Sequence, residues 1–413
     1  MRKMRARRCK KARIPLKLVT TSPYPMADDF PRRSPTIGLV MARRGTLRTV
    51  QVLRALAAIM VVFAHLIGPD TLEGRLPGHV GFLDGLGRLG PAGVGLFFVI
   101  SGVIMVLTTM DSGAGVVPAR QFLLKRIVRI YPPYLVITAF LFAVSLVSPG
   151  AVDSSQAIRP DDVASFLLLP QLGFPLLLVG WTLVYEMYFY LVYTLAMLVK
   201  GRARGVVLVA WTAATFVLME LVPAGGNAYL NLARDPINLQ FGLGALVGWL
   251  LATRKAVAPI VVASAGTLAS VVVLVLAAES FPPISGGSSL GRSLLIGVPF
   301  AILVYGAVGL EERGLVRAPS VLSHLGDVSY SLYLTHVVVL GAIKRAVTGL
   351  DDQRLAVHLG LLVLALAAVV VVAEVFYRVV EKPLLSVLHH RLASALGRRM
   401  PPVLDERVPP AAA

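Results

Sequence analysis

Residues 51–70 read QVLRALAAIMVVFAHLIGPD, an apolar run that is interrupted by Arg54 and His65. About 20 apolar residues in a helix are enough to cross the roughly 30 Å hydrocarbon core of a bilayer. Arg54 and His65 are eleven residues apart, so their side chains project from nearly the same face of such a helix and lie roughly 16 Å apart along its axis. Ionisable side chains within a membrane usually mark function. We therefore expect the two residues to line one polar seam; the alternative is that each belongs to its own membrane interface.

The composition indicates an integral membrane protein. Of 413 residues, 56% are hydrophobic and 15% are charged, whereas soluble domains have about 25% charged residues. The apolar runs do not alternate as outer-membrane barrel strands do. We therefore predict an all-α membrane protein, a polytopic bundle of about ten transmembrane helices. The predicted spans are 48–67, 90–110, 132–148, 181–199, 205–222, 236–253, 257–278, 293–310, 326–344 and 356–378.

The excess of basic residues fits a membrane topology better than nucleic-acid binding. The formal net charge is +18, but lysine and arginine occur in short clusters between apolar runs and at both ends of the chain. This distribution follows the positive-inside rule. It favours a cytosolic N-terminus and C-terminus, and nucleic acid is not expected as a partner.

Three segments stand apart from the predicted spans. Residues 1–46 form a basic leader that we expect to be disordered, and Met41 is an alternative start. Residues 47–385 would form the transmembrane domain and 386–413 a cytosolic tail. The segment 163–180, VASFLLLPQLGFPLLLVG, is interrupted by proline and glycine. It is expected to be a re-entrant or interfacial element, because irregular backbone at membrane depth must be covered by protein or line a cavity.

A pair of arginines precedes the third predicted span. In QFLLKRIVRIYPPY, Arg126 and Arg129 lie one turn apart, just before Pro132 and Pro133, which are compatible with the start of a helix. Two guanidinium groups there could bind phosphates in a bidentate manner. The alternative is an ordinary basic collar at the cytosolic surface, and spacing alone does not decide between them.

A carboxylate lies inside the fourth predicted span. Glu186 occurs in VGWTLVYEMYFYLVY, among several tyrosines. A carboxylate at that depth needs a partner, and His65 is the natural candidate, because a glutamate that orients a histidine is an arrangement used for acyl transfer. The alternative is a hydrogen bond between Glu186 and a tyrosine.

The ninth predicted span carries a polar stripe. In GDVSYSLYLTHVVVL, Ser329, Tyr333 and His336 are spaced i, i+4 and i+7, so they share one helix face. We interpret this face as a cavity wall, with inter-helix hydrogen bonding as the alternative. Neither His65 nor His336 has a carboxylate or second histidine at ligand spacing, so no metal is expected.

Residues 87–102, GRLGPAGVGLFFVISG, are rich in small side chains. The segment leads into a predicted membrane helix and lacks the strand that precedes a phosphate-binding loop. Small residues in membrane helices allow close backbone contact between neighbours. We therefore predict tight helix packing here.

Taken together, the motifs resemble the acyltransferase 3 family of bacterial membrane O-acyltransferases over about residues 47–385. The motif sequences GVGLFFVISGVIM and GWTLVYEMYFY are most similar to those of the exopolysaccharide-production branch, which acetylates sugar units of secreted polysaccharides. The motifs, in order, are the Arg54 and His65 pair, GVGLFFVISGVIM, the Arg126 and Arg129 pair, GWTLVYEMYFY with Glu186, SYSLYLTH ending at His336, and VEKPLL with Glu381.

The resemblance implies an O-acetyltransferase that is a multi-pass protein of the bacterial inner membrane. Its co-substrate would be acetyl-CoA or another acyl-CoA from the cytosol, with no bound cofactor. Its acceptor would be a hydroxyl of a cell-surface or secreted glycan, or of a glycolipid, and polysaccharide-synthesis machinery is a possible partner. Rival interpretations are a carrier of lipid-linked sugars, although no inverted repeat is evident, and a non-catalytic scaffold.

The family pattern also implies roles for single residues. His65 would be essential to the transfer and Arg54 would belong to the same path, while Arg126 and Arg129 would contribute to donor binding. Neutral imidazole could take the proton of the acceptor hydroxyl or carry the acyl group itself. The sequence leaves these two mechanisms open.

Overall fold

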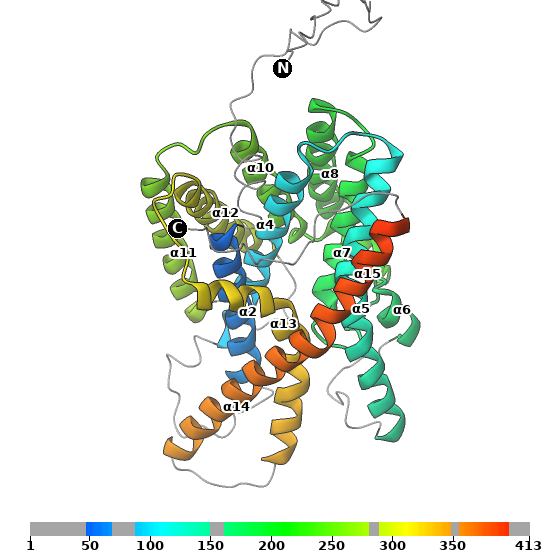
Figure 1. The fold of residues 1–413 in the computed structure, drawn as a ribbon, viewed down its shortest axis with the longest axis vertical. Helices are drawn as coiled ribbons and strands as arrows, with labels where there is room; N and C mark the ends of the chain where they lie inside the picture. Colours follow the sequence, from blue (N-terminus) through cyan, green and yellow to red (C-terminus); the bar gives the residue numbers. More distant parts are fainter. Residues whose placement is uncertain (1–46, 68–86, 149–160, 281–288, 348–354, 396–413) are drawn as a thin grey trace, which may run out of the picture. The chain divides into compact units, whose positions relative to one another are not determined.

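The computed structural model describes residues 47–67, 87–148, 161–280, 289–347 and 355–395, which belong to one compact unit of the chain (Figure 1). Within these ranges the secondary structure is helical and contains no strand. The protein is therefore an all-α polytopic membrane protein, as predicted. The expected leader, 1–46, with its alternative start, and the end of the expected tail, 396–413, lie outside the described residues.

Each predicted span coincides with a helix. In chain order these helices are α2 (Arg48–Ile67), α4 (Gly90–Thr109), α5 (Val116–Val147), α7 (Gly180–Ala196), α8 (Arg202–Leu221), α10 (Asn238–Thr253), α11 (Pro259–Ser280), α12 (Leu290–Glu312), α13 (Ser320–Ala346) and α14 (Leu355–Phe376). The remaining elements are α6 (Asp162–Leu167), α9 (Ala228–Arg234), the π-helix η4 (Tyr377–Glu381) and α15 (Lys382–Ala395).

By length and apolarity, eight of the described helices could cross a membrane, and the pair α9 and α10, bent by 42°, would be a ninth. Helix α7 has 17 residues and is shorter than these helices. It nevertheless packs against α5 in the opposite direction, because Gly180 lies beside Tyr134 while Tyr193 lies beside Phe122. This direction is the one expected for consecutive spans.

Contacts at both ends of α2 show the directions of its neighbours. Gly326 lies against the backbone of Gln51, and His336 lies beside His65, so α13 and α2 run in the same direction. Glu311, near the end of α12, accepts hydrogen bonds from the backbone N–H groups at the start of α2, so α12 and α2 run in opposite directions. These relations fit first, eighth and ninth spans that alternate across a bilayer.

Two of the predicted span boundaries are wrong. Helix α5 is a single helix of 32 residues with Pro132 and Pro133 inside it, so it begins well before the predicted start at 132. A proline does not donate a backbone hydrogen bond, so Val128 O and Arg129 O lose their usual helical donors, and Tyr330 donates to the neighbouring Ile130 O at 2.8 Å. Consequently Arg126 lies within the helix and not at its mouth.

The second boundary error concerns the end of the last span. Figure 1 shows α14, η4 and α15 as one long helical path, which continues beyond the predicted end at 378. The π-helix accommodates the approach to Pro383, since a widened turn often occurs where the regular hydrogen-bond ladder is interrupted. Glu381, the last residue of η4, is fully buried.

Glycine contacts bring the central helices together. A Cβ atom at Gly244 of α10 would lie 2.1 Å from Val99 O of α4, and one at Gly102 would lie 2.3 Å from Phe241 O. A Cβ atom at Gly93 would likewise lie 2.7 Å from Ala57 O of α2. These contacts confirm the close packing predicted for residues 87–102, and they place α4 between α2 and α10.

The irregular segment 163–180 contains α6 and is packed on α5. Tyr134 donates to Ser165 O, Tyr131 donates to Leu167 O at 2.7 Å, and the Ser165 hydroxyl accepts from Leu176 N at 3.0 Å. Protein side chains therefore satisfy part of this backbone, which is the condition for an irregular segment at membrane depth.

Candidate active site

A cavity of about 120 Å³ lies among α2, α4, α5, α7 and α13. Six of the eight predicted site residues line it: Arg54, Arg126, Arg129, Glu186, Ser329 and Tyr333. Apolar and small polar side chains complete the wall, among them Phe97, Phe98, Ser101, Ile104, Met105 and Thr182. His65 and His336 are not part of this wall. The sequence therefore identified most of the cavity correctly, while the two histidines need a separate description.

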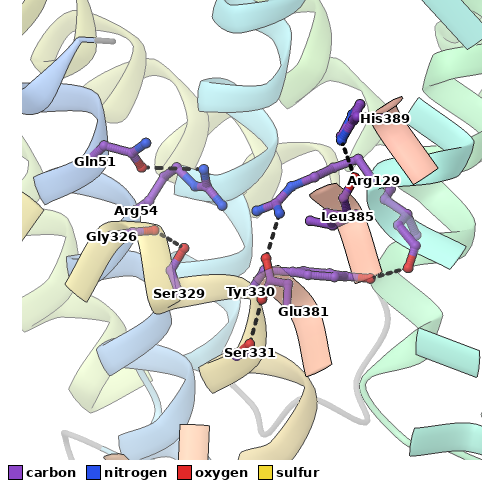
Figure 2. A network of polar contacts seen from close by, with 11 residues as sticks. Gln51, Arg54, Arg129, Gly326, Ser329, Tyr330, Ser331, Glu381, Leu385 and His389 are labelled. Carbon is purple, nitrogen blue, oxygen red and sulfur yellow. Dashed lines mark hydrogen bonds and ion pairs between the residues drawn. The ribbon is translucent and has the colours of Figure 1, made fainter. Parts of the chain in front are cut away.

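Two arginines approach one another at the cavity. Figure 2 shows the guanidinium groups of Arg54 and Arg129 pointing toward each other from α2 and α5. Arg54 donates to Gln51 Oε1 at 3.3 Å. Arg129 forms an ion pair with Glu381, with 2.5 Å between Nη1 and Oε1. Two guanidinium groups in one place attract anions, and only one of them has this close carboxylate.

Glu381 is a functional candidate whose role the sequence reasoning missed. The sequence shows it only as part of the motif VEKPLL after the last predicted span, yet it is the charge partner of Arg129 and also accepts from Ser331 Oγ at 2.5 Å (Figure 2). A buried arginine requires a carboxylate, which was a usable signal. The helix continues past 378 and carries Glu381 into the bundle. The apolar pattern does not predict this continuation.

Arg126 is held less firmly by the described residues. Its guanidinium lies 5.4 Å from the ring centre of Phe122 and 5.8 Å from that of Tyr190. Its Nη2 donates to Thr108 Oγ1 at a long 3.4 Å, and its buried Nε has no hydrogen-bond partner in the structure. The charged side chains on the cavity wall are three arginines and one glutamate, so this wall carries net positive charge when all four are ionised.

The predicted pair of Glu186 with His65 is wrong. Glu186 accepts hydrogen bonds from Ser101 Oγ, at 3.1 Å, and from the hydroxyl of Tyr190, one turn further along α7. The alternative of a glutamate bonded to a tyrosine is therefore the correct one. The physical reason is the rotation of the helices, because Glu186 faces α4 whereas His65 faces α13.

His65 lies beside His336. The distance from His65 Nδ1 to His336 Nε2 is 3.4 Å, and the ring centres are 5.0 Å apart at an angle of 67°. Each Nδ1 also contacts the carbonyl four residues earlier in its own helix, Val61 O at 2.9 Å and Leu332 O at 3.1 Å. A carbonyl oxygen only accepts, so Nδ1 of each neutral ring carries the proton. His65 Nε2 is then the nitrogen able to accept one.

Tyr333 joins the cavity to the histidine pair. Its hydroxyl is 2.6 Å from Thr182 Oγ1 and donates to Val179 O at 3.1 Å. Its ring lies 5.8 Å from that of His336. Ser329 also lines the cavity, although its hydroxyl donates to Gly326 O within α13. The predicted polar stripe thus has two members on the cavity wall and a third, His336, next to His65.

Apolar helices, a cavity lined by three arginines and one glutamate, and an adjacent pair of imidazoles together describe a polytopic membrane protein with a polar site inside its helix bundle. Comparison with known proteins makes this class specific: the model of the acyltransferase domain family matches residues 48–377. The chain belongs to this family and is an acyltransferase. It is 30% identical over 319 residues to the "Exopolysaccharide production protein ExoZ" of Rhizobium meliloti (strain 1021), a match that covers 72% of this chain and 90% of that protein.

Proposed function

We propose that the protein is an O-acetyltransferase of exopolysaccharide, which moves an acetyl group from cytosolic acetyl-CoA to a sugar hydroxyl. The family supplies the acyl transfer, and the name of the relative from Rhizobium meliloti supports a secreted polysaccharide as the acceptor. The observation that carries the proposal is the arginine-lined cavity close to a histidine pair. Polysaccharide-synthesis machinery would supply the acceptor.

The cavity suits an acyl-CoA donor. Coenzyme A carries phosphates at its nucleotide end and a thin, uncharged pantetheine arm that ends in the thioester. Arg54 and Arg126 are the arginines on the wall without an ion pair to a described carboxylate, and a guanidinium binds phosphate oxygens in a bidentate manner. In this proposal Arg126 and Arg54 bind the phosphates, while Arg129 is held in place by Glu381.

His65 would carry out the proton transfer. The acceptor O–H gives its proton to His65 Nε2 as its oxygen bonds to the thioester carbonyl carbon. The C–S bond then breaks, and the leaving thiolate takes the proton from His65. The same Nε2 could instead carry the acetyl group and pass it to the acceptor oxygen. Quenching with denaturing detergent near neutral pH during the first turnover with radiolabelled donor separates the two routes, since only the second leaves label on the protein and an acyl-imidazole does not survive acid.

The proposed location is the bacterial inner membrane, with both chain ends in the cytosol. The support is the distribution of arginine and lysine between loops. Cysteines introduced at Asp162, a partly exposed position, and at Arg202, an exposed one, test it with an impermeant thiol reagent in intact spheroplasts. Position 162 should be labelled and position 202 should not. Labelling at 202 would place the donor end of the cavity outside the cell and contradict the proposal.

The activity is tested with purified protein in lipid nanodiscs. Radiolabelled acetyl-CoA and de-O-acetylated exopolysaccharide fragments should give alkali-labile label on the glycan and free coenzyme A in equal amounts. His65→Gln protein of equal purity is the control. A carrier of lipid-linked sugars would instead leave acetyl-CoA unconsumed, and that result would refute the proposed function.

A further inference from the structure

A fully buried imidazole, that of His336, lies beside His65, the proposed proton acceptor. His336 has no solvent exposure and lies on α13, which approaches α2 so closely that a Cβ atom at Gly326 would meet Gln51 O at 2.1 Å. Further along the same two helices, toward their C-terminal ends, His336 of α13 contacts His65 of α2. The close packing of these two parallel helices is therefore what brings the imidazoles together.

The hydrogen-bond pattern gives the two rings different roles. His336 donates its Nδ1–H to Leu332 O, so its Nε2 has the lone pair and faces His65 Nδ1 at 3.4 Å. His65 Nδ1–H is directed at Val61 O and at His336 Nε2. His336 is thus a hydrogen-bond acceptor for His65, the role that a carboxylate has in many serine hydrolases. A neutral acceptor avoids placing another anion in the membrane interior.

We propose that His336 is a positioning residue for acyl transfer, which holds the His65 ring so that its Nε2 faces the acceptor hydroxyl. This inference rests on the proposed function of His65. Val61 O by itself can select the tautomer, but a second acceptor on another helix also limits rotation of the ring. A histidine that only filled space would need no acceptor nitrogen at this position.

His336 stabilises His65 more strongly during the reaction than before it, because the His65 ring gains a proton. When His65 Nε2 takes the proton of the acceptor hydroxyl, the ring becomes a cation with two N–H groups. Its Nδ1–H bond to His336 Nε2 is then charge-assisted and stronger. His65 returns the Nε2 proton to the leaving thiolate, and His336 keeps its own proton on Nδ1 throughout. Loss of His336 should therefore lower kcat and leave donor binding unchanged.

The test compares His336→Leu, which removes the acceptor nitrogen, with His336→Gln, whose amide oxygen can accept from His65. His324→Leu is the matched control, because His324 lies on the same helix but pairs with Glu374. In nanodiscs, His336→Leu should lower kcat about 10-fold, the size expected when one hydrogen bond to a charged group is lost. KM for acetyl-CoA should stay within about twofold, because the lost interaction strengthens during the transfer and is not made with the donor, and His336→Gln should recover most of kcat. The control should match wild type.

Equal losses in the leucine and glutamine variants, or full activity of the leucine variant, would overturn the proposal. If His336→Leu does not fold, [¹⁵N]histidine NMR of the wild-type protein decides. The His65 signal is assigned as the one that disappears in His65→Gln. In wild-type protein it must show a protonated Nδ1 that is coupled across a hydrogen bond to a nitrogen of a second imidazole ring. Absence of that coupling would refute the role of His336. Absence of transfer by wild-type protein would instead refute the proposed function. The NMR measurement does not depend on activity, so the two failures can be distinguished.

Discussion

The ion pair between Arg129 and Glu381 allows a stability prediction. Glu381→Gln removes the negative charge and preserves the side-chain volume. The two groups are 2.5 Å apart, with 22% of the arginine side chain and none of the glutamate exposed. Removing one partner of a buried ion pair costs about 3–5 kcal/mol. Because water reaches part of Arg129, we expect the lower value, a loss of about 3 kcal/mol in the free energy of unfolding.

The assay is reversible unfolding of purified protein in mixed micelles, followed by circular dichroism as the denaturing detergent is increased. A loss of about 3 kcal/mol raises the unfolded fraction roughly 100-fold at a given detergent composition. Glu374→Gln is the matched control, since Glu374 is partly exposed and pairs with two exposed side chains, Arg378 and His324. An exposed ion pair is worth at most about 1 kcal/mol, so the control should unfold close to wild type.

A double variant isolates the unpaired charge as the cause. Arg129→Met combined with Glu381→Leu removes both charges, and it should be more stable than Glu381→Gln alone, since apolar replacement of a complete buried pair is often neutral. The reasoning is refuted if Glu381→Gln and Glu374→Gln unfold alike. It is equally refuted if the double variant is no more stable than the single one.

Three further predictions concern the site and the packing. His65→Gln should fold and insert normally but lose glycan acetylation by a factor on the order of 10² or more, as expected for removal of a positioned base; near-normal acetylation measured by mass spectrometry of the glycan would contradict this. Arg126→Ala should raise KM for acetyl-CoA about 10-fold and Arg126→Lys should recover only part of it, because lysine keeps the charge but not the bidentate geometry; steady-state kinetics with unchanged KM would make Arg126 a topological residue only. Gly244→Ala should destabilise the protein by about 1–3 kcal/mol through a clash with Val99 O, whereas Gly205→Ala, in open space, should be neutral or slightly stabilising in the same unfolding assay.

The apolar runs of the sequence were sufficient to predict the helices, because a lipid environment requires backbone groups to be satisfied within each segment. Each predicted span coincides with a helix in the structure. The same physics identified cavity residues. Arg54, Glu186 and Tyr333 are polar side chains in apolar helices, which avoid lipid and therefore face the interior of the bundle, where all three line one cavity.

The partner of each polar residue was decided only by the tertiary structure. Glu186 meets Ser101 and Tyr190, while His65 meets His336. Periodicity indicates that a residue faces the interior, but it does not say which helix lies opposite. That choice depends on helix rotation and adjacency, which here follow from backbone contacts at glycines such as Gly326.

The helix that follows the tenth span shows the same limit. The sequence indicated an apolar segment ending near 378 and a motif with Glu381 beyond it. Only the fold showed that the helix continues and that Glu381 is buried against Arg129, 252 positions earlier in the chain. An ion pair forms where two backbones bring opposite charges together, so its existence depends on the path of the chain through space, which hydrophobic periodicity does not encode.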